Sequence, residues 1–135
     1  MTDAASSLQQ GIYQTLTAAT AVTDLLGGPN VFDHVPANAR LPYLTIGQSV
    51  TRDWSSGTED GSEHIVTLHA WSRAGGRRQV LAITGAVRDA LHDTAISLTD
   101  HNLVNLRFEF SQGRRDPDGE TWHGLVRFRA VTETN

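Results

Sequence analysis

Apolar residues recur every three or four positions in two stretches of the chain, which predicts two main helices. The first stripe lies in residues 7–19, with Ser6 or Ser7 as its N-cap, and consists of Leu8, Ile12, Leu16 and Ala19. The second lies in Arg77–His92 and consists of Val80, Ile83, Thr84, Val87 and Leu91. A short helical turn over residues 21–26 follows the first stripe and stops at Gly27-Gly28-Pro29, because Gly and Pro terminate helices.

Other stretches alternate between apolar and polar positions, which is the pattern of a strand with one buried face. They are Tyr43–Asp53, Ser62–Arg73, Leu103–Glu109 and Thr121–Thr132, with a short strand at Val31 and Phe32. The predicted inward side chains are Leu44, Ile46 and Val50, then Val66, Leu68 and Ala70, then Val104, Leu106, Phe108 and Phe110, and last Trp122, Val126, Phe128 and Ala130. The opposite face carries a mixture of ring and arginine side chains, namely His69, Trp71, Arg107, His123, Arg127 and Arg129.

The order of these elements predicts an α+β fold in a single domain of residues 1–135. Runs of strands separated by one helix favour a mostly antiparallel sheet of four to five strands with the two main helices on one face. A chain of 135 residues is also the usual length of one domain.

The strands Tyr43–Asp53 and Ser62–Arg73, joined by the loop Trp54–Gly61, are predicted to form a long β-hairpin. Ten residues of strand run roughly 33 Å, whereas most strands have about 5–6 residues. A small domain cannot cover that length, so we expect the hairpin to project beyond its own core toward a neighbouring chain.

Composition narrows the classes of function. The chain has no cysteine, which removes disulfides, thiolate metal sites and cysteine nucleophiles. Its formal net charge is −4 and all 11 basic residues are arginines spread along the chain, whereas a duplex-DNA binder usually has a basic stripe. The chain has no apolar run long enough to span a membrane and no secretory signal at its start, so we expect a protein made in the cytoplasm.

The sequence contains no arrangement of residues typical of catalysis, so we predict a protein that is not an enzyme and has no catalytic, cofactor-binding or metal-binding residues. His64 and His69 are five apart on a predicted strand, which places them on opposite faces. The alternative from a different class is a small metal-dependent hydrolase that uses His64, His69 or His123 with a nearby Asp.

Tryptophan and arginine dominate protein interfaces, so they supply the candidate contact residues. The candidates are Trp54, Glu59, Asp60, Glu63, Trp71, Arg73, Arg77, Arg78 and Arg114. We expect the acidic loop to meet Arg77, Arg78 or Arg114 of a neighbouring copy. The alternatives are that Trp71 covers the edge of the core and that the loop is simply solvated.

Five segments carry a resemblance to a known family. They are LQQGIYQTLTAATAVTDLLGG, VFDHVPANARLPYLTIG, the tryptophan-containing loop, HIVTLHAWSRAGG before a helix, and NLVNLRFEFSQGRRDPDGETWHGLVRFRAVTE. Together they cover Leu8 to Glu133, and the sequence resembles the tail terminator (tail completion) proteins of long-tailed bacteriophages and gene transfer agents. LHAWSRAGGR and RDPDG-x-x-W-H-G resemble the gene transfer agent branch in particular.

This resemblance implies a structural virion protein, assembled in the bacterial cytoplasm and located at the head-proximal end of the tail. Family members form a hexameric ring that stops polymerisation of the tail tube and presents a surface for the head-side connector or stopper protein. DNA passes through the ring without specific binding, and no cofactor or membrane is involved. The nearest alternatives are a head–tail connector or stopper of the neck and a tail tube protein.

Overall fold

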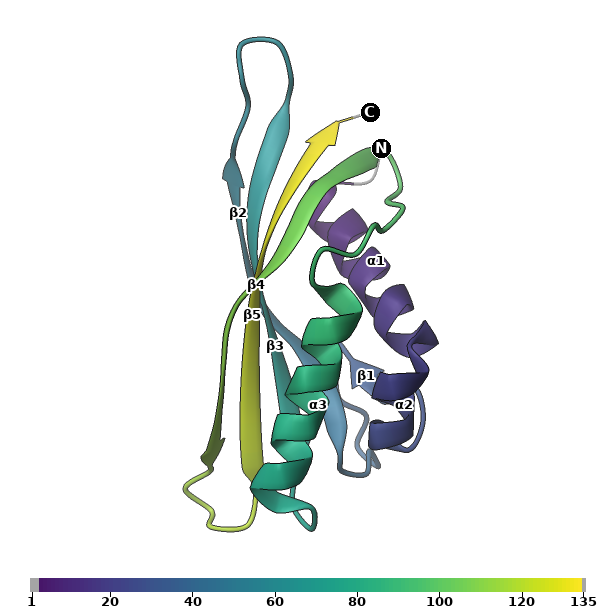
Figure 1. The fold of residues 1–135 in the computed structure, drawn as a ribbon, viewed down its shortest axis with the longest axis vertical. Coiled ribbons are helices and arrows are strands. Elements are labelled where there is room, and N and C mark those ends of the chain that lie inside the picture. Colours follow the sequence, from purple (N-terminus) through teal and green to yellow (C-terminus); the bar gives the residue numbers. More distant parts are fainter. Residues whose placement is uncertain (1–2, 135) are drawn as a thin grey trace.

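A five-stranded mixed sheet carries three helices on one of its faces (Figure 1). The computed structural model describes residues 3–134. The strands are β1 (Val31–Phe32), β2 (Tyr43–Asp53), β3 (Gly61–Ser72), β4 (His101–Arg115) and β5 (Trp122–Thr134), and the helices are α1 (Ala4–Ala18), α2 (Thr20–Leu26) and α3 (Gly76–Leu91). The order across the sheet is β1-β2-β3-β5-β4, and only the β1–β2 pair is parallel. The predicted α+β class is confirmed.

The helices follow the predicted apolar stripes. All five stripe residues of α3, from Val80 to Leu91, are buried against the sheet. α1 begins at Ala4 rather than at residue 7, because the side chain of Asp3 accepts a hydrogen bond from the Ser6 amide and caps the helix. α2 ends at Leu26, and Gly27 follows it in the left-handed conformation with φ of 76°.

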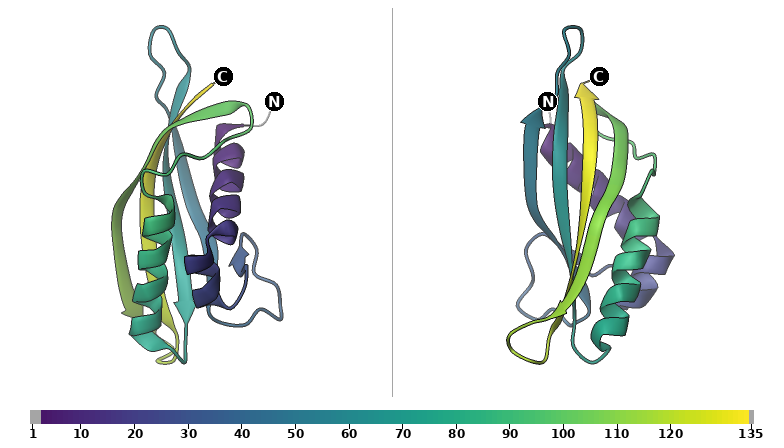
Figure 2. Two further views of the ribbon diagram at one scale, coloured as in Figure 1. Left: turned by 45° about the vertical axis from the view of Figure 1, so that its right-hand side comes forward. Right: turned by 60° about the vertical axis from the view of Figure 1, so that its left-hand side comes forward.

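The hydrophobic core lies between the helices and the sheet (Figure 2). Phe128 at the centre of β5 is fully buried, and its ring meets the Phe108 ring edge-on at 6.1 Å. Gly124 of β5 lets α3 approach closely, since a Cβ atom there would lie 2.5 Å from Val80 Cγ1 and 2.8 Å from Thr84 Cγ2.

Three β-bulges change which side chains reach this core. The register of β2 shifts between Ile46 and Ser49, and that of β4 shifts between Leu103 and Asn105 and again between Phe108 and Phe110. One extra residue reverses the alternation that follows it. Three side chains predicted to point inward are therefore exposed instead, namely Val50 (37%), Val104 (51%) and Phe110 (38%).

β4 is also much longer than predicted. It runs from His101 to Arg115 and pairs with β5 over almost its whole length, whereas the sequence pattern ended at Glu109. The added residues Ser111–Arg115 are mostly exposed and polar, so they carry no hydrophobic alternation that a sequence pattern could detect.

Candidate functional site

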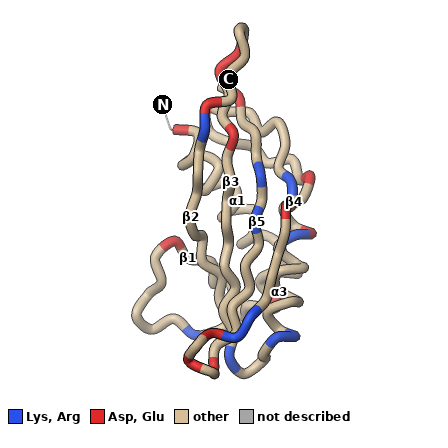
Figure 3. The backbone as a smooth tube through the Cα atoms, turned by 90° about the vertical axis from the view of Figure 1, so that its left-hand side faces the viewer, with Lys and Arg blue, Asp and Glu red and all other residues tan. Residues whose placement is uncertain are grey.

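The face of the sheet opposite the helices, which we call the open sheet face, is not covered by any other element of residues 3–134 (Figures 2 and 3). Cross-strand pairing assembles its side chains into rows. One row contains Ile65, Arg129 and Arg107, and the row toward the lower end in Figure 3 contains Trp71, His123 and Arg114. The predicted mixture of rings and arginines on this face is confirmed.

Arginines on the open sheet face stack on aromatic rings. The Arg129 guanidinium lies 5.3 Å from the centre of the Trp54 ring, and its Nε donates to Glu63 Oε2 at 2.7 Å. The Arg127 guanidinium lies 4.5 Å from the centre of the Phe110 ring. Glu63 was predicted to contact a neighbouring chain, but its carboxylate already has a partner in its own chain.

Trp71 belongs to a stacked ring cluster rather than to the edge of the core. Its indole lies parallel to the His123 ring at 4.1 Å and donates to Thr45 Oγ1 at 3.1 Å. His69 Nδ1 and His123 Nε2 share a hydrogen bond of 2.6 Å. Because Trp71 lies on the open sheet face, it does not cover the helix-side core.

His64 lies on the other face of the sheet, as its spacing from His69 predicted. It is fully buried, and its ring nitrogens form hydrogen bonds with Thr51 Oγ1 at 3.0 Å and Thr132 Oγ1 at 2.9 Å. The histidines of the hydrolase alternative therefore do not share one site, since the sheet separates His64 from His69 and His123.

Burial lowers the pKa of each of these three histidines. For His64 a smaller contribution comes from His101, and for His69 from Arg114. For His123 burial comes first, followed by the effect of His69, and Asp116 acts in the opposite direction. His123 Nδ1 is buried and has no hydrogen-bond partner among residues 3–134, and it lies 4.0 Å from Asp116 Oδ1.

The lowered pKa values predict that the protein loses stability on acidification. The unfolded chain binds protons below its ordinary histidine pKa near 6.5, while the folded chain resists them. Stability is thus complete above about pH 6.5 and falls as the pH drops toward the folded pKa values. Urea unfolding at pH 7.5, 6.5 and 5.5 measures the slope, and His64→Gln should reduce it by at most about 1.4 kcal/mol per pH unit.

The control for this experiment is His34→Gln, because the side chain of His34 is exposed in the loop after β1. This variant should retain the wild-type dependence on pH. An unchanged slope in His64→Gln would contradict the assignment of the proton uptake to His64.

The predicted contact residues separate into two groups at opposite ends of the molecule (Figure 3). Trp54, Glu59 and Asp60 lie at the β2–β3 loop, which we call the acidic end, and Glu63 follows them in β3. The arginines gather where the β3–α3 and β4–β5 connections meet, which we call the basic end. They are the predicted Arg73, Arg77, Arg78 and Arg114, with Trp71 nearby, and also Arg40 and Arg115, which were not among the candidates.

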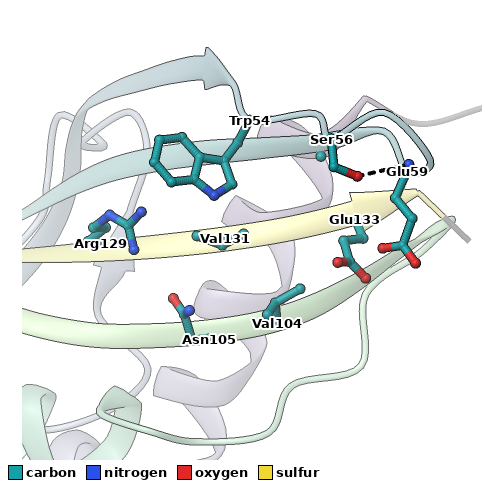
Figure 4. A pocket seen from close by; sticks show the side chains of 9 residues that line it. Trp54, Ser56, Glu59, Val104, Asn105, Arg129, Val131 and Glu133 are labelled. Carbon is teal, nitrogen blue, oxygen red and sulfur yellow. Dashed lines mark hydrogen bonds between the residues drawn. The ribbon is translucent and has the colours of Figure 1, made fainter.

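A groove of about 440 Å³ lies beside the β2–β3 loop at the acidic end (Figure 4). Trp54 and Arg129 lie toward one end, Glu59 and Glu133 lie side by side at the other, and Val104 and Val131 lie between them. The groove also includes Ser56, Gly61 and Asn105. The sequence did not indicate Val104, Asn105 or Glu133 as parts of a site, because only the pairing of β4 and β5 brings them to the β2–β3 loop.

An uncovered sheet face of arginines and rings, between two ends of opposite charge, is typical of a protein that assembles with other chains. The sequence matches the family "Tail completion protein gp17" over residues 10–133, and the chain belongs to this family. It is therefore a structural protein of the tail.

A solved structure agrees with this assignment. The fold matches a chain in "Virion of native gene transfer agent (GTA) particle" with a TM-score of 0.89 and 29% sequence identity, covering 98% of this chain and 99% of that chain. A comparison with curated proteins found no match. Within residues 3–134, no helix is long and apolar enough to cross a membrane.

Proposed function

We propose that the protein is the tail terminator of a phage-like particle. Six copies form a ring at the head-proximal end of the tail tube, where the ring stops tube polymerisation and offers a surface to the head-side connector or stopper protein. DNA passes through the ring without specific binding. The observation that carries this proposal is the likeness to the gene transfer agent virion chain over 98% of the sequence.

The surfaces support a ring built by contacts between unlike regions. A contact that joins two different patches closes into a ring when a whole number of repeats completes one full turn without a shift along the axis. The acidic and basic ends provide two such patches on one chain. The protein acts through these surfaces, by binding its own copies and its two neighbours in the particle, rather than by catalysis.

Light scattering coupled to size exclusion, with negative-stain images of the same peak, tests the proposal. We expect a mass near six subunits with ring views, either for the protein alone or after addition of tail tube protein. When the protein is added to tail tubes, a ring should be found at one end of each tube, and that tube should stop growing. A monomer that ignores the tube would overturn the proposal, and rings that bind only to other neck proteins would favour a connector instead.

Trp54→Ala should weaken assembly much more than it weakens the fold. The Trp54 side chain is 55% exposed, and its main partner is the stacked Arg129 guanidinium. We expect the free energy of unfolding to fall by no more than about 1 kcal/mol, while the concentration needed for half-assembly rises at least tenfold, as hot-spot tryptophans do at interfaces.

The matched control is Tyr13→Ala, since Tyr13 is an exposed aromatic residue on α1, away from the acidic end. The Tyr13→Ala variant should form rings at the same protein concentration as the wild type. Equal losses of stability and assembly in Trp54→Ala would mean that Trp54 supports the fold and not the contact.

A further inference from the structure

The acidic end carries carboxylates that pair with no cation among residues 3–134. Glu59, Asp60 and Glu133 form no ion pair within residues 3–134, whereas the neighbouring Glu63 is paired with Arg129. The carboxyls of Glu59 and Glu133 lie side by side (Figure 4), and Glu59 raises the pKa of Glu133 by sharing a hydrogen bond with it and by its charge. Two adjacent carboxylates repel each other, and a cation between them would remove that repulsion.

Beside these carboxylates the groove offers acceptor oxygens and an apolar floor. Its one lining cation, Arg129, lies toward the other end and is already paired with Glu63. Asn105 Oδ1 is buried and has no donor among residues 3–134. Val104 is 51% exposed, and Trp54 presents an indole that is 55% exposed. A guanidinium has five N–H donors and no acceptor, and its aliphatic stem packs on apolar side chains. The groove therefore fits an arginine better than a neutral or acidic side chain.

The basic end has the complementary excess, because its six arginines outnumber the three carboxylates of the β4–β5 connection, Asp116, Asp118 and Glu120. Arg77, Arg78, Arg114 and Arg115 are exposed and form no ion pair with a carboxylate of residues 3–134. Arg77 and Arg115 both lie near the Trp122 ring, with guanidinium carbons 5.1 and 5.2 Å from its centre. The two ends lie at opposite extremes of the sheet (Figure 3), so one copy cannot pair them with each other.

We propose that the groove at the acidic end binds Arg114 and Arg115 of the β4–β5 connection of a second copy. This inference rests on the proposed function and gives the ring its contact: each subunit places its basic end against the groove of the next. Repeated around the ring, this pairing gives every unpaired carboxylate at Glu59 and Glu133 an arginine partner. It also fixes one direction around the ring, because the two ends differ.

Charge reversal at each end tests the pairing. Glu59→Arg with Glu133→Arg reverses the groove, and Arg114→Glu with Arg115→Glu reverses the basic end. We expect each double variant alone to need at least tenfold more protein for half-assembly, measured by light scattering. Mixing the two double variants in equal amounts should restore rings in which the variants alternate. Each reversed groove then meets a reversed basic end, and each normal groove meets a normal basic end. The quadruple variant should also form rings.

A control separates this pairing from a general effect of charge. Asp24→Arg with Asp89→Arg changes the charge as much as the groove variant does, but on exposed positions of α2 and α3. It should assemble as the wild type does, and thermal unfolding should show that all variants fold. If the protein assembles only on tail tubes, the same variants are compared with tubes present.

The outcomes distinguish this inference from the proposed function. Rings that form normally in both double variants, or a mixture that fails to restore them, would overturn the pairing and leave the terminator role intact. A wild type that forms no rings with or without tubes would overturn the proposed function itself. Rescue by mixing supports both.

Discussion

Replacing Ser55–Asp60 with Asn-Gly should leave a folded monomer that no longer assembles into rings. The six residues are all exposed, so their removal exposes no core. Trp54 and Gly61 are already joined by a backbone hydrogen bond of 2.9 Å from the Trp54 amide, and a two-residue Asn-Gly turn connects strands paired in this way. The variant lacks Glu59 and Asp60, and its β2–β3 loop is shorter.

Light scattering and thermal unfolding of the same sample measure this result. We expect a mass of one subunit and a melting temperature within a few degrees of the wild type, because surface changes rarely exceed about 0.5 kcal/mol. Thr58→Ala is the matched control within the loop, since Thr58 is exposed and its hydroxyl shares a hydrogen bond of 3.4 Å with the Ser56 hydroxyl of the same loop. A shortened protein that still ran as a hexamer would contradict the role of the loop.

Phe128→Ala should have the largest effect on stability. The Phe128 side chain is fully buried at the centre of the sheet, packed edge-on against Phe108. Truncation of a buried phenylalanine removes its transfer free energy and leaves a cavity, which together cost about 3–5 kcal/mol. The melting temperature of a domain of this size should fall by roughly 10–20 °C.

Phe110→Ala is the control that also tests the bulge in β4. The alternating pattern predicted the same inward orientation for Phe110 and Phe128, but Phe110 points to the open sheet face beneath Arg127 and is 38% exposed. Calorimetry of the monomer should therefore show a loss of no more than about 1 kcal/mol from the missing stacking contact. Similar losses in both variants would mean that Phe110 is also part of the core.

The sequence predicted best the elements whose pattern is local. The stripe of α3 and the alternation of β3 were right at every position, because helix and strand periods are set within a few residues. The end of α2 before Gly27 was right for the same reason, since glycine adopts the left-handed conformation without a steric penalty. The family resemblance also came from the sequence, and the match over residues 10–133 confirms it.

The candidate residues were a different case, because the sequence indicated residue types and could not indicate distances. It predicted that the acidic loop meets Arg77, Arg78 or Arg114 of a neighbouring copy, but it could not place either group in the molecule. The structure places them at opposite ends of the sheet, so any contact between them must join two chains. Glu133 and Asn105 escaped notice because neither belongs to a local motif, and they reach the groove only through the pairing of β4 with β5.

By itself, then, the sequence determined the fold class, the ends of most elements and the residue types available for contact. Each depends on interactions between residues close together in the chain. Only the tertiary structure decided the bulges that turn Val50, Val104 and Phe110 outward, and the insertion of β5 between β3 and β4. Register depends on pairing between distant strands, where one added residue reverses every side chain after it. The separation of acidic and basic ends follows from that pairing as well.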